Sequence, residues 1–228
     1  MDDLSPFCLK LKGYLKLAGV AYKAPPFDPA CLQKAPKGKL PFVALKGGRL
    51  MSDSGMIIDH LIAEGACDLD NGLSAVQKAT SLAYRRLLEE NLYWILLYTR
   101  WKDEPGWHIM KQLFFESMPV LLKQIVAKYQ QTHMWNKLKA HGMGLHNREE
   151  IYEIGRKDIQ ALSTLLGDQT HCFGAKKPTL LDITLYAFTA NILNPPIENP
   201  LKAAVKDKTN LVAHCNHMHS LVGQPVGG

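Results

Sequence analysis

The 228-residue sequence lacks a long apolar run, an N-terminal leader of basic and then apolar residues, and any run of four lysines. A bilayer-spanning helix needs about 20 apolar residues, so we expect no transmembrane anchor. Without a leader, a cytoplasmic protein is expected. Internal repeats and low-complexity tracts are also missing. Because 21% of the residues are charged and 46% are hydrophobic, the composition indicates a folded chain with a sizeable core.

Cysteine is scarce, and its spacing is irregular. The number is odd and no two cysteines are close in sequence, which favours reduced thiols over a disulfide framework. The five residues are Cys8, Cys31, Cys67, Cys172 and Cys215.

The formal net charge of +6 raises the question of a nucleic-acid partner. The lysines are scattered through amphipathic segments, and this pattern favours solvated helix faces. We therefore expect no nucleic-acid partner and at most a mild attraction for small anions.

The N-terminal part combines helices with short strands. Apolar residues at helical spacing predict a helix from Pro6 to Ala18, with Ser5 as its N-cap. Strands are expected at 20–23, 42–45 and 49–51, and the last two flank a Gly-Gly hairpin signal. Another helix is expected from about Asp53 to Glu64.

Beyond a linker at residues 68–72, the pattern is almost entirely helical. The expected segments are 75–101, 107–129, 148–166, 179–193 and 201–222. The sequence thus predicts an α/β domain at residues 1–66, followed by an all-α domain at residues 73–228.

Four short motifs follow one another in a recognisable order. Ser5–Cys8 opens the first helix with the spacing of a C-x-x-C redox motif, but a serine replaces the first cysteine. Leu40-Pro41 precedes a strand, Asp53-Ser54 opens a helix, and Thr179–Asp182 forms a capping box. In this order and spacing the chain resembles the cytosolic glutathione transferase family over essentially its whole length.

Further residues resemble one branch of that family, the branch related to failed axon connections and metaxin. They are the segment 88–94, Tyr98, Arg100-Trp101, His141-Gly142, Gly144 and Asn210-Leu211.

The resemblance implies a thioredoxin-like N-terminal domain, a helical C-terminal domain and glutathione as co-substrate. Ser5 lies at a helix N-terminus, where its hydroxyl would donate to the glutathione thiolate. The same serine can equally act only as an N-cap, and the two roles can coexist.

Four further residues of the N-terminal domain are implied to hold the tripeptide. Leu40 would pair with its cysteinyl main chain next to a cis-Pro41. Ser54 would hold the γ-glutamyl carboxylate and Asp53 the γ-glutamyl ammonium group. The alternative for Asp53 and Ser54 is a plain helix cap.

The second substrate is expected against the long helix at 75–101. Trp94, Tyr98 and Trp101 share one face of it, at positions i, i+4 and i+7. Such a stripe either packs in the core or forms the wall of a pocket for flat apolar electrophiles. A homodimer is a further expectation from the resemblance.

Two other groups of residues give weaker indications of function. His214, Cys215, His217 and His219 are metal-ligand types, but no second ligand pair is near them in sequence, so no metal is expected. Thr179 and Asp182 are expected to stabilise the helical domain as a buried cap.

One departure from the family concerns the first strand of the thioredoxin-like sheet. Only four residues precede Ser5, and two of them are aspartates, so this strand is expected to be missing. The leading hypothesis is a transferase that conjugates glutathione to an electrophilic small molecule. The alternatives are a non-catalytic interaction module and a glutaredoxin-like reductase that uses Cys8.

Overall fold

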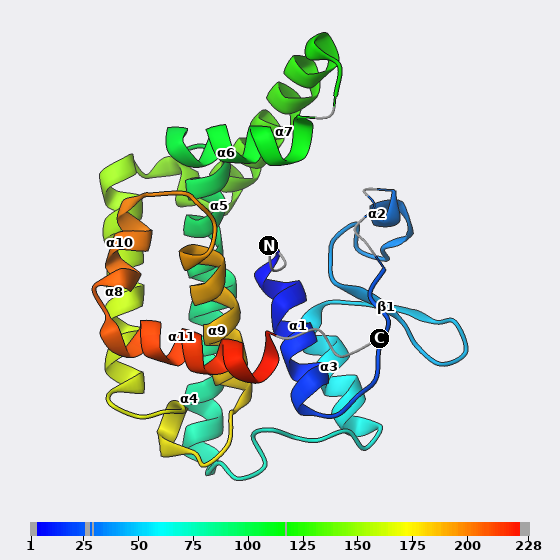
Figure 1. Ribbon diagram of the computed structural model, residues 1–228, viewed down its shortest axis with the longest axis vertical. Helices are drawn as coiled ribbons and strands as arrows, with labels where there is room; N and C mark the ends of the chain where they lie inside the picture. Colours follow the sequence, from blue (N-terminus) through cyan, green and yellow to red (C-terminus); the bar gives the residue numbers. More distant parts are fainter. Residues whose placement is uncertain (1–3, 26–27, 29, 117, 224–228) are drawn as a thin grey trace. The chain divides into compact units, whose positions relative to one another are not determined.

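The computed structural model describes residues 4–25, 28, 30–116 and 118–223 (Figure 1). Residues 1–3, which bear on the expected absence of a first strand, lie outside the described residues. In chain order the elements are α1 (Pro6–Leu17), α2 (Cys31–Lys34), β1 (Phe42–Ala44), β2 (Leu50–Ser52), α3 (Ser54–Ala63), α4 (Ala75–Arg86), the π-helix η1 (Leu87–Leu92), α5 (Tyr93–Trp101), α6 (Glu104–Phe115), α7 (Val120–His141), the 3-10 helix η2 (Met143–Leu145), α8 (Arg148–Leu166), the 3-10 helix η3 (Cys172–Gly174), α9 (Leu180–Leu193), α10 (Pro200–Lys206) and α11 (Thr209–Val222).

The chain forms two compact units that interleave in sequence. Unit 1 comprises Met1–Leu82, Asp168–Asn191 and Ala213–Gly228, and unit 2 comprises Ala83–Gly167 and Ile192–Val212. The expected fold class is confirmed, because a small α/β part precedes a helical part. The domain boundary expected at residues 66–73 stays a prediction.

A two-stranded antiparallel sheet is the only sheet among the described residues of unit 1. Phe42 pairs with Ser52, and the strands are joined by a turn through Gly47 and Gly48. Both glycines have positive φ, 88° and 83°, a conformation that side chains with a Cβ rarely adopt. The hairpin predicted from the Gly-Gly signal is therefore confirmed.

Helix α1 is anchored in the core of unit 1. The ring of Phe7 meets that of Phe188 on α9 edge to face, with centroids 5.9 Å apart. A Cβ added at Gly13 would lie 3.1 Å from the side chain of Ile183, so α1 and α9 approach closely there. Tyr14 is fully buried, and its hydroxyl donates to the carbonyl of Cys67 at 3.1 Å. These contacts fix the helix that Ser5 begins.

The strand expected at residues 20–23 is wrong. This segment has no regular secondary structure, and residues 21–25 are exposed. Its residue types favour an extended backbone, but a β-strand also needs a hydrogen-bonded neighbour. None of the described strands pairs with it.

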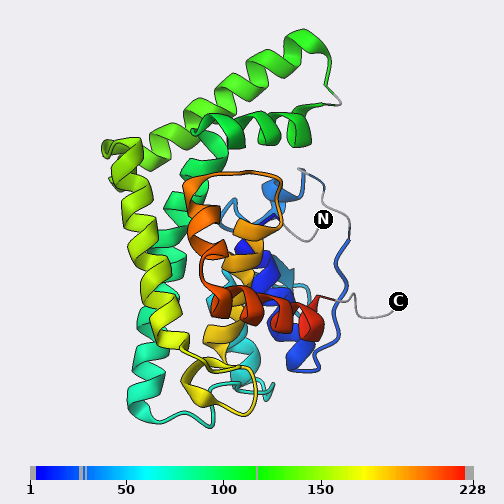
Figure 2. The ribbon, with the colours of Figure 1, turned by 60° about the vertical axis from the view of Figure 1, so that its left-hand side comes forward.

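Unit 2 is organised around α5, which packs against α6, α7 and α8. Figure 2 shows α5 and α8 running side by side. The single helix expected at 107–129 is wrong, because α6 ends at Phe115 and Pro119 occupies the N-cap of α7. The single helix expected at 201–222 is also wrong, since α10 ends before Asp207 and α11 begins at Thr209.

The helix expected at 75–101 is continuous but contains a π-helical segment in its middle. Asn91 of this segment donates its amide N–H to Asp158 Oδ2 on α8 at 2.7 Å. Burial raises the pKa of the Asp158 carboxyl to about 6, although the hydrogen bond from Asn91 acts in the opposite direction. The charged form of Asp158 is therefore disfavoured in the folded protein.

Replacing Asp158 with asparagine is expected to stabilise the protein at pH 7 by about 1–3 kcal/mol. A carboxyl with a raised folded pKa binds more protons when folded than when unfolded. The stability of the native protein therefore falls as the pH rises from about 4 to about 6. The new side-chain amide would still accept from Asn91 without carrying charge. Urea unfolding of both proteins at pH 4 and pH 7 measures the difference. Equal stability of the two at pH 7 would contradict the expectation.

Candidate functional site

The β1–β2 hairpin of unit 1 brings two of the predicted motifs together. Because Phe42 pairs with Ser52, the residues just outside the ladder, Pro41 and Asp53, are neighbours. The amide of Asp53 donates to the carbonyl of Pro41 at 3.3 Å. The Leu40–Pro41 peptide bond is cis, as the resemblance implies. Leu40 is half-buried and Pro41 is buried.

Asp53 has a backbone conformation that is uncommon for its residue type. Its φ of 81° lies in the left-handed region, where Asp and Asn are among the few side chains tolerated. As N-cap of α3, its Oδ1 accepts from the amides of Gly55 at 2.9 Å and Met56 at 3.2 Å. Both bonds use Oδ1, and the side chain is exposed. Oδ2 is therefore positioned to accept from a cationic group in solution.

Ser54 is the first residue of α3, and its side chain is 3% exposed. The amides of Gly55 and Met56 are already occupied by Asp53, so the amide and hydroxyl of Ser54 are the groups left at this helix start. Neither has a partner among the described residues. A helix N-terminus with a donor of this kind favours a carboxylate.

Ser5 is the N-cap of α1, as predicted. Its Oγ accepts from the amide of Cys8 at 3.3 Å, and its backbone is extended. The side chain is half-buried. Helix α1 packs against α3, and both helices begin at the upper end of this pair in Figure 1.

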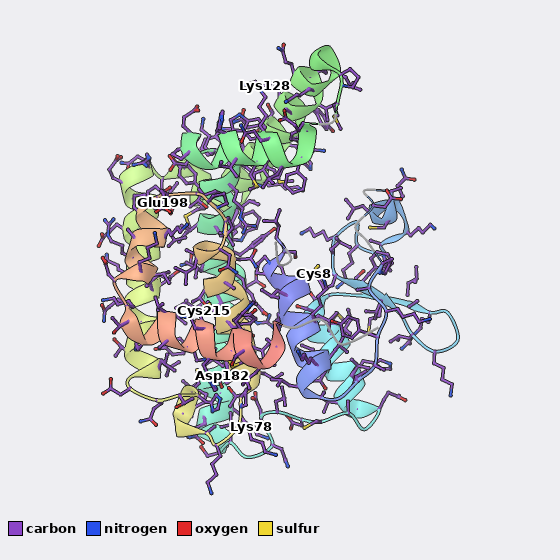
Figure 3. The ribbon with its side chains drawn as sticks, viewed as in Figure 1. Cys8, Lys78, Lys128, Asp182, Glu198 and Cys215 are labelled. Carbon is purple, nitrogen blue, oxygen red and sulfur yellow. The ribbon has the colours of Figure 1, made fainter. Side chains whose placement is uncertain are left out.

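Cys8, labelled in Figure 3, follows one turn later and is 8% exposed. Thiol exchange needs an accessible thiolate. This burial disfavours the Cys8 reductase hypothesis.

The aromatic stripe lies on α5 in unit 2, where each ring has an aromatic or imidazole neighbour. Trp94 stacks on His141 with centroids 4.2 Å apart. Tyr98 is buried and meets Tyr152 edge to face. Trp101 is half-buried near aromatic rings of α6. These contacts give the stripe a packing role, and its predicted role in substrate binding stays a prediction.

The capping box at the start of α9 is confirmed. Asp182 Oδ2 accepts from the amide and from the hydroxyl of Thr179, both at 2.7 Å. Its Oδ1 accepts from the Cys172 amide at 2.8 Å, and His214 Nε2 lies 2.9 Å away. Thr179, Cys172, Asp182 and His214 are all at least 97% buried. Figure 3 labels Asp182 at the start of α9.

Burial and the nearby carboxylate strongly shift the protonation of this cluster. Burial, with Asp182 beside it, raises the pKa of the Cys172 thiol far above its usual range. Burial alone would raise the pKa of Asp182 as well, but the hydrogen bond and charge of His214 hold it below its usual value. The cluster therefore contains a neutral thiol and a carboxylate.

The histidines near the C-terminus do not converge on a shared centre. His214 points to Asp182, His217 to His171, and the ring of His219 lies 3.0 Å from the Tyr186 hydroxyl. Cys172, Asp182 and His214 instead form a group whose potential ligand atoms lie within 4.8 Å of one another. Sequence spacing could not reveal this group, because its members come from three separate segments. Among the described helices, none combines the length and the apolar character that crossing a membrane requires.

Comparison with known protein families gives two matches along the chain. Residues 6–106 match the family described as the glutathione S-transferase N-terminal domain. Residues 155–218 match the family described as the glutathione S-transferase C-terminal domain.

Three relatives share about a third of their aligned residues with this chain. The chain is 33% identical to Failed axon connections of Drosophila melanogaster over 96% of its own length, which corresponds to 54% of that protein. It is 32% identical to the isoprene-epoxide glutathione S-transferase of Rhodococcus sp., with 93% and 90% of the two chains covered. It is 33% identical to human metaxin-2, with 81% and 70% covered.

Two solved structures share the fold at low sequence identity. The β-etherase of Sphingobium sp. strain SYK-6 superimposes with a TM-score of 0.63 at 16% identity, with 95% and 90% of the chains covered. Glutaredoxin 2 of Salmonella typhimurium in complex with glutathione gives a TM-score of 0.53 at 16% identity, with 98% and 93% covered.

Proposed function

The chain belongs to the glutathione S-transferase family, and on that premise we propose that it binds glutathione and conjugates its thiolate to an electrophilic small molecule. One observation carries the proposal. The hairpin places Pro41 beside Asp53, whose exposed carboxylate and unusual φ are fixed at the start of α3. This arrangement fits the extended main chain and charged γ-glutamyl end of the tripeptide.

Each residue of the proposed glutathione site has a distinct chemical role. The carboxylate of Asp53 accepts from the γ-glutamyl ammonium group, and the amide and hydroxyl of Ser54 donate to the γ-glutamyl carboxylate. Leu40 offers its main chain to the cysteinyl residue of glutathione. Glutathione is the co-substrate, and the proposed reaction uses no metal ion.

Ser5 acts on the sulfur of bound glutathione. The thiol loses its proton to solvent, and the Ser5 hydroxyl donates to the resulting thiolate at the positive end of α1. The thiolate then forms a bond to the electrophilic carbon, whose leaving group or opened ring oxygen takes the displaced electron pair. An epoxide is one such electrophile, the kind named for the Rhodococcus relative.

The second substrate is proposed to lie against α5. Trp94 and Trp101 are half-buried and so present some surface to a flat apolar molecule, while Tyr98 is buried against Tyr152. We further propose a cytoplasmic protein that forms homodimers and acts in detoxification, as expected for a transferase of this kind.

Replacing Asp53 with asparagine is expected to weaken glutathione binding by about ten- to a hundredfold, because a hydrogen bond to a charged group contributes roughly 1.5–3 kcal/mol. Asparagine tolerates positive φ and still caps α3, so the fold is retained. Isothermal titration with glutathione measures the dissociation constant. Asp59→Asn makes the same charge change at an exposed position of the same helix and should leave binding unchanged. An equal loss of glutathione affinity in both variants would mean that the effect comes from net charge and not from a contact of Asp53.

A second candidate function is that of a non-catalytic interaction module. The observation in its favour is that identity to Failed axon connections and to metaxin-2 equals identity to the transferase within one percentage point. Pull-down of partners by the native chain and by Ser5→Ala and Asp53→Ala tests this function. A module retains its partners in both variants and shows no conjugation. Conjugation activity that is lost in these variants excludes a purely non-catalytic role.

A further inference from the structure

Two histidines of unit 1 point their Nε2 atoms at each other. His171 precedes η3 and His217 lies on α11, and the two Nε2 atoms are 3.2 Å apart. The rings are tilted by 54° with centroids 5.2 Å apart, so they meet at the nitrogens and are not stacked face to face. From this geometry we propose that His171 and His217 bind a divalent transition-metal ion of the Zn²⁺ class.

The separation of the two nitrogens suits a shared ion. Two imidazole nitrogens bound to one tetrahedral Zn²⁺ at roughly 2.0–2.1 Å are about 3.3–3.4 Å apart. The observed 3.2 Å falls within a few tenths of an ångström of that value. To bind the ion, each ring turns so that its Nε2 lone pair points at the ion instead of at the other nitrogen.

The tautomer of His171 is set for metal binding. Its Nδ1 lies 3.1 Å from the carbonyl of Ala175, and a carbonyl can only accept, so Nδ1 carries the proton. Nε2 of His171 therefore has a lone pair directed at His217. A backbone carbonyl holding the other nitrogen is the usual arrangement around a metal-bound histidine.

Both histidines are held by the buried Asp182 network. Cys172, the residue after His171, donates its amide to Asp182 at 2.8 Å. His214, one turn before His217 on α11, lies 2.9 Å from the same carboxylate. One anchoring point thus fixes both backbones, as a preorganised site requires. His171 is 9% exposed and His217 is half-buried, so His217 is the more accessible of the two.

The group formed by Cys172, Asp182 and His214 is the less suitable metal site. The carboxylate of Asp182 already accepts from Cys172, Thr179 and His214. An ion there would displace bonds that cap α9. At the outer pair, the two Nε2 atoms have only each other as hydrogen-bond partners among the described residues, so an ion there displaces no bond that caps a helix. Two imidazoles leave two positions of a tetrahedral ion for water, so the affinity is expected to be lower than that of a four-ligand structural site.

The test is titration of the metal-free full chain with Zn²⁺ by calorimetry, together with electron paramagnetic resonance of the chain loaded with one equivalent of Cu²⁺. We expect one Zn²⁺ per chain and nitrogen hyperfine structure in the Cu²⁺ spectrum. His217→Gln and His171→Gln should each weaken Zn²⁺ binding at least tenfold. His133→Gln, at an exposed histidine of α7, is the matched control and should leave binding unchanged.

The remaining outcomes overturn the proposal. If the folded native chain binds no Zn²⁺, or if His217→Gln binds Zn²⁺ as tightly as the native chain, the two histidines form only an N–H···N hydrogen bond. Cys172→Ser separates the two groups of residues, since loss of binding in this variant with retention in His217→Gln would place the ion in the inner group. His217 is half-buried, whereas His171 is buried, so His217→Gln is the variant expected to keep the native fold. Circular dichroism of His217→Gln checks that it is folded.

Discussion

Replacing Asp182 with alanine is expected to destabilise the protein by about 4–5 kcal/mol, which would leave little or no folded protein at 37 °C. The carboxylate accepts from two backbone amides, from the hydroxyl of Thr179 and from the His214 ring, and all of these groups are buried. Alanine leaves them without an acceptor, and each unsatisfied buried donor costs about 1–3 kcal/mol.

Urea unfolding followed by circular dichroism measures this loss for the native chain and for Asp182→Ala. Asp168→Ala is the matched control, because Asp168 is an exposed aspartate close to η3, and its removal should change stability by less than about 0.5 kcal/mol. Asp182→Asn keeps one acceptor oxygen, so its stability should lie between that of Asp182→Ala and that of the native chain. A midpoint for Asp182→Ala that equals the native one would show that the donors find other partners.

Features set by neighbouring residues were predictable from the sequence. Ser5 and Pro6 favour a helix start whatever surrounds them, and Ser5 indeed caps α1. Gly47 and Gly48 favour a tight turn for the same local reason. The hairpin then sets the strand register, and the register alone places Pro41 beside Asp53. Much of the candidate glutathione site therefore followed from short segments.

Features that depend on a distant partner were not predictable. Residues 20–23 have suitable side chains for a strand, but their state depends on whether another strand lies beside them. Pro119 could be seen in the sequence, yet the helical periodicity on either side of it concealed the break between α6 and α7. The π-helical segment around Asn91 and its bond to Asp158 likewise join residues 67 positions apart.

The histidine and cysteine residues show the same limit. His214, His217 and His219 are close in sequence, and α11 directs them to different partners. The meeting of His171 with His217 depends on how η3 and α11 lie in unit 1, and no local pattern encodes that distance. The sequence shows which residues could bind a metal, but only the fold shows which of them lie next to each other.

Replacing Ser5 with aspartate is expected to lower the rate of glutathione conjugation about 10²-fold, the usual effect of removing one donor to a developing or full negative charge. Aspartate is as good an N-cap as serine, so the amide of Cys8 keeps its acceptor and α1 keeps its stability. The substitution therefore separates the two roles of Ser5. It removes the proton donor to sulfur and places a like charge beside the thiolate.

The dependence of the rate on pH distinguishes this role from a structural one. If Ser5 stabilises the thiolate, Ser5→Asp and Ser5→Ala raise the pKa of bound glutathione, and the rising limb of the profile moves to higher pH by about 1–2 units. Ser5→Thr keeps both the cap and the hydroxyl and should retain most of the activity. Unfolding measurements on the same variants detect the cap, whose loss in Ser5→Ala costs about 1 kcal/mol. A profile unchanged in Ser5→Asp would assign Ser5 to capping alone and leave the positive end of α1 as the stabiliser of the thiolate.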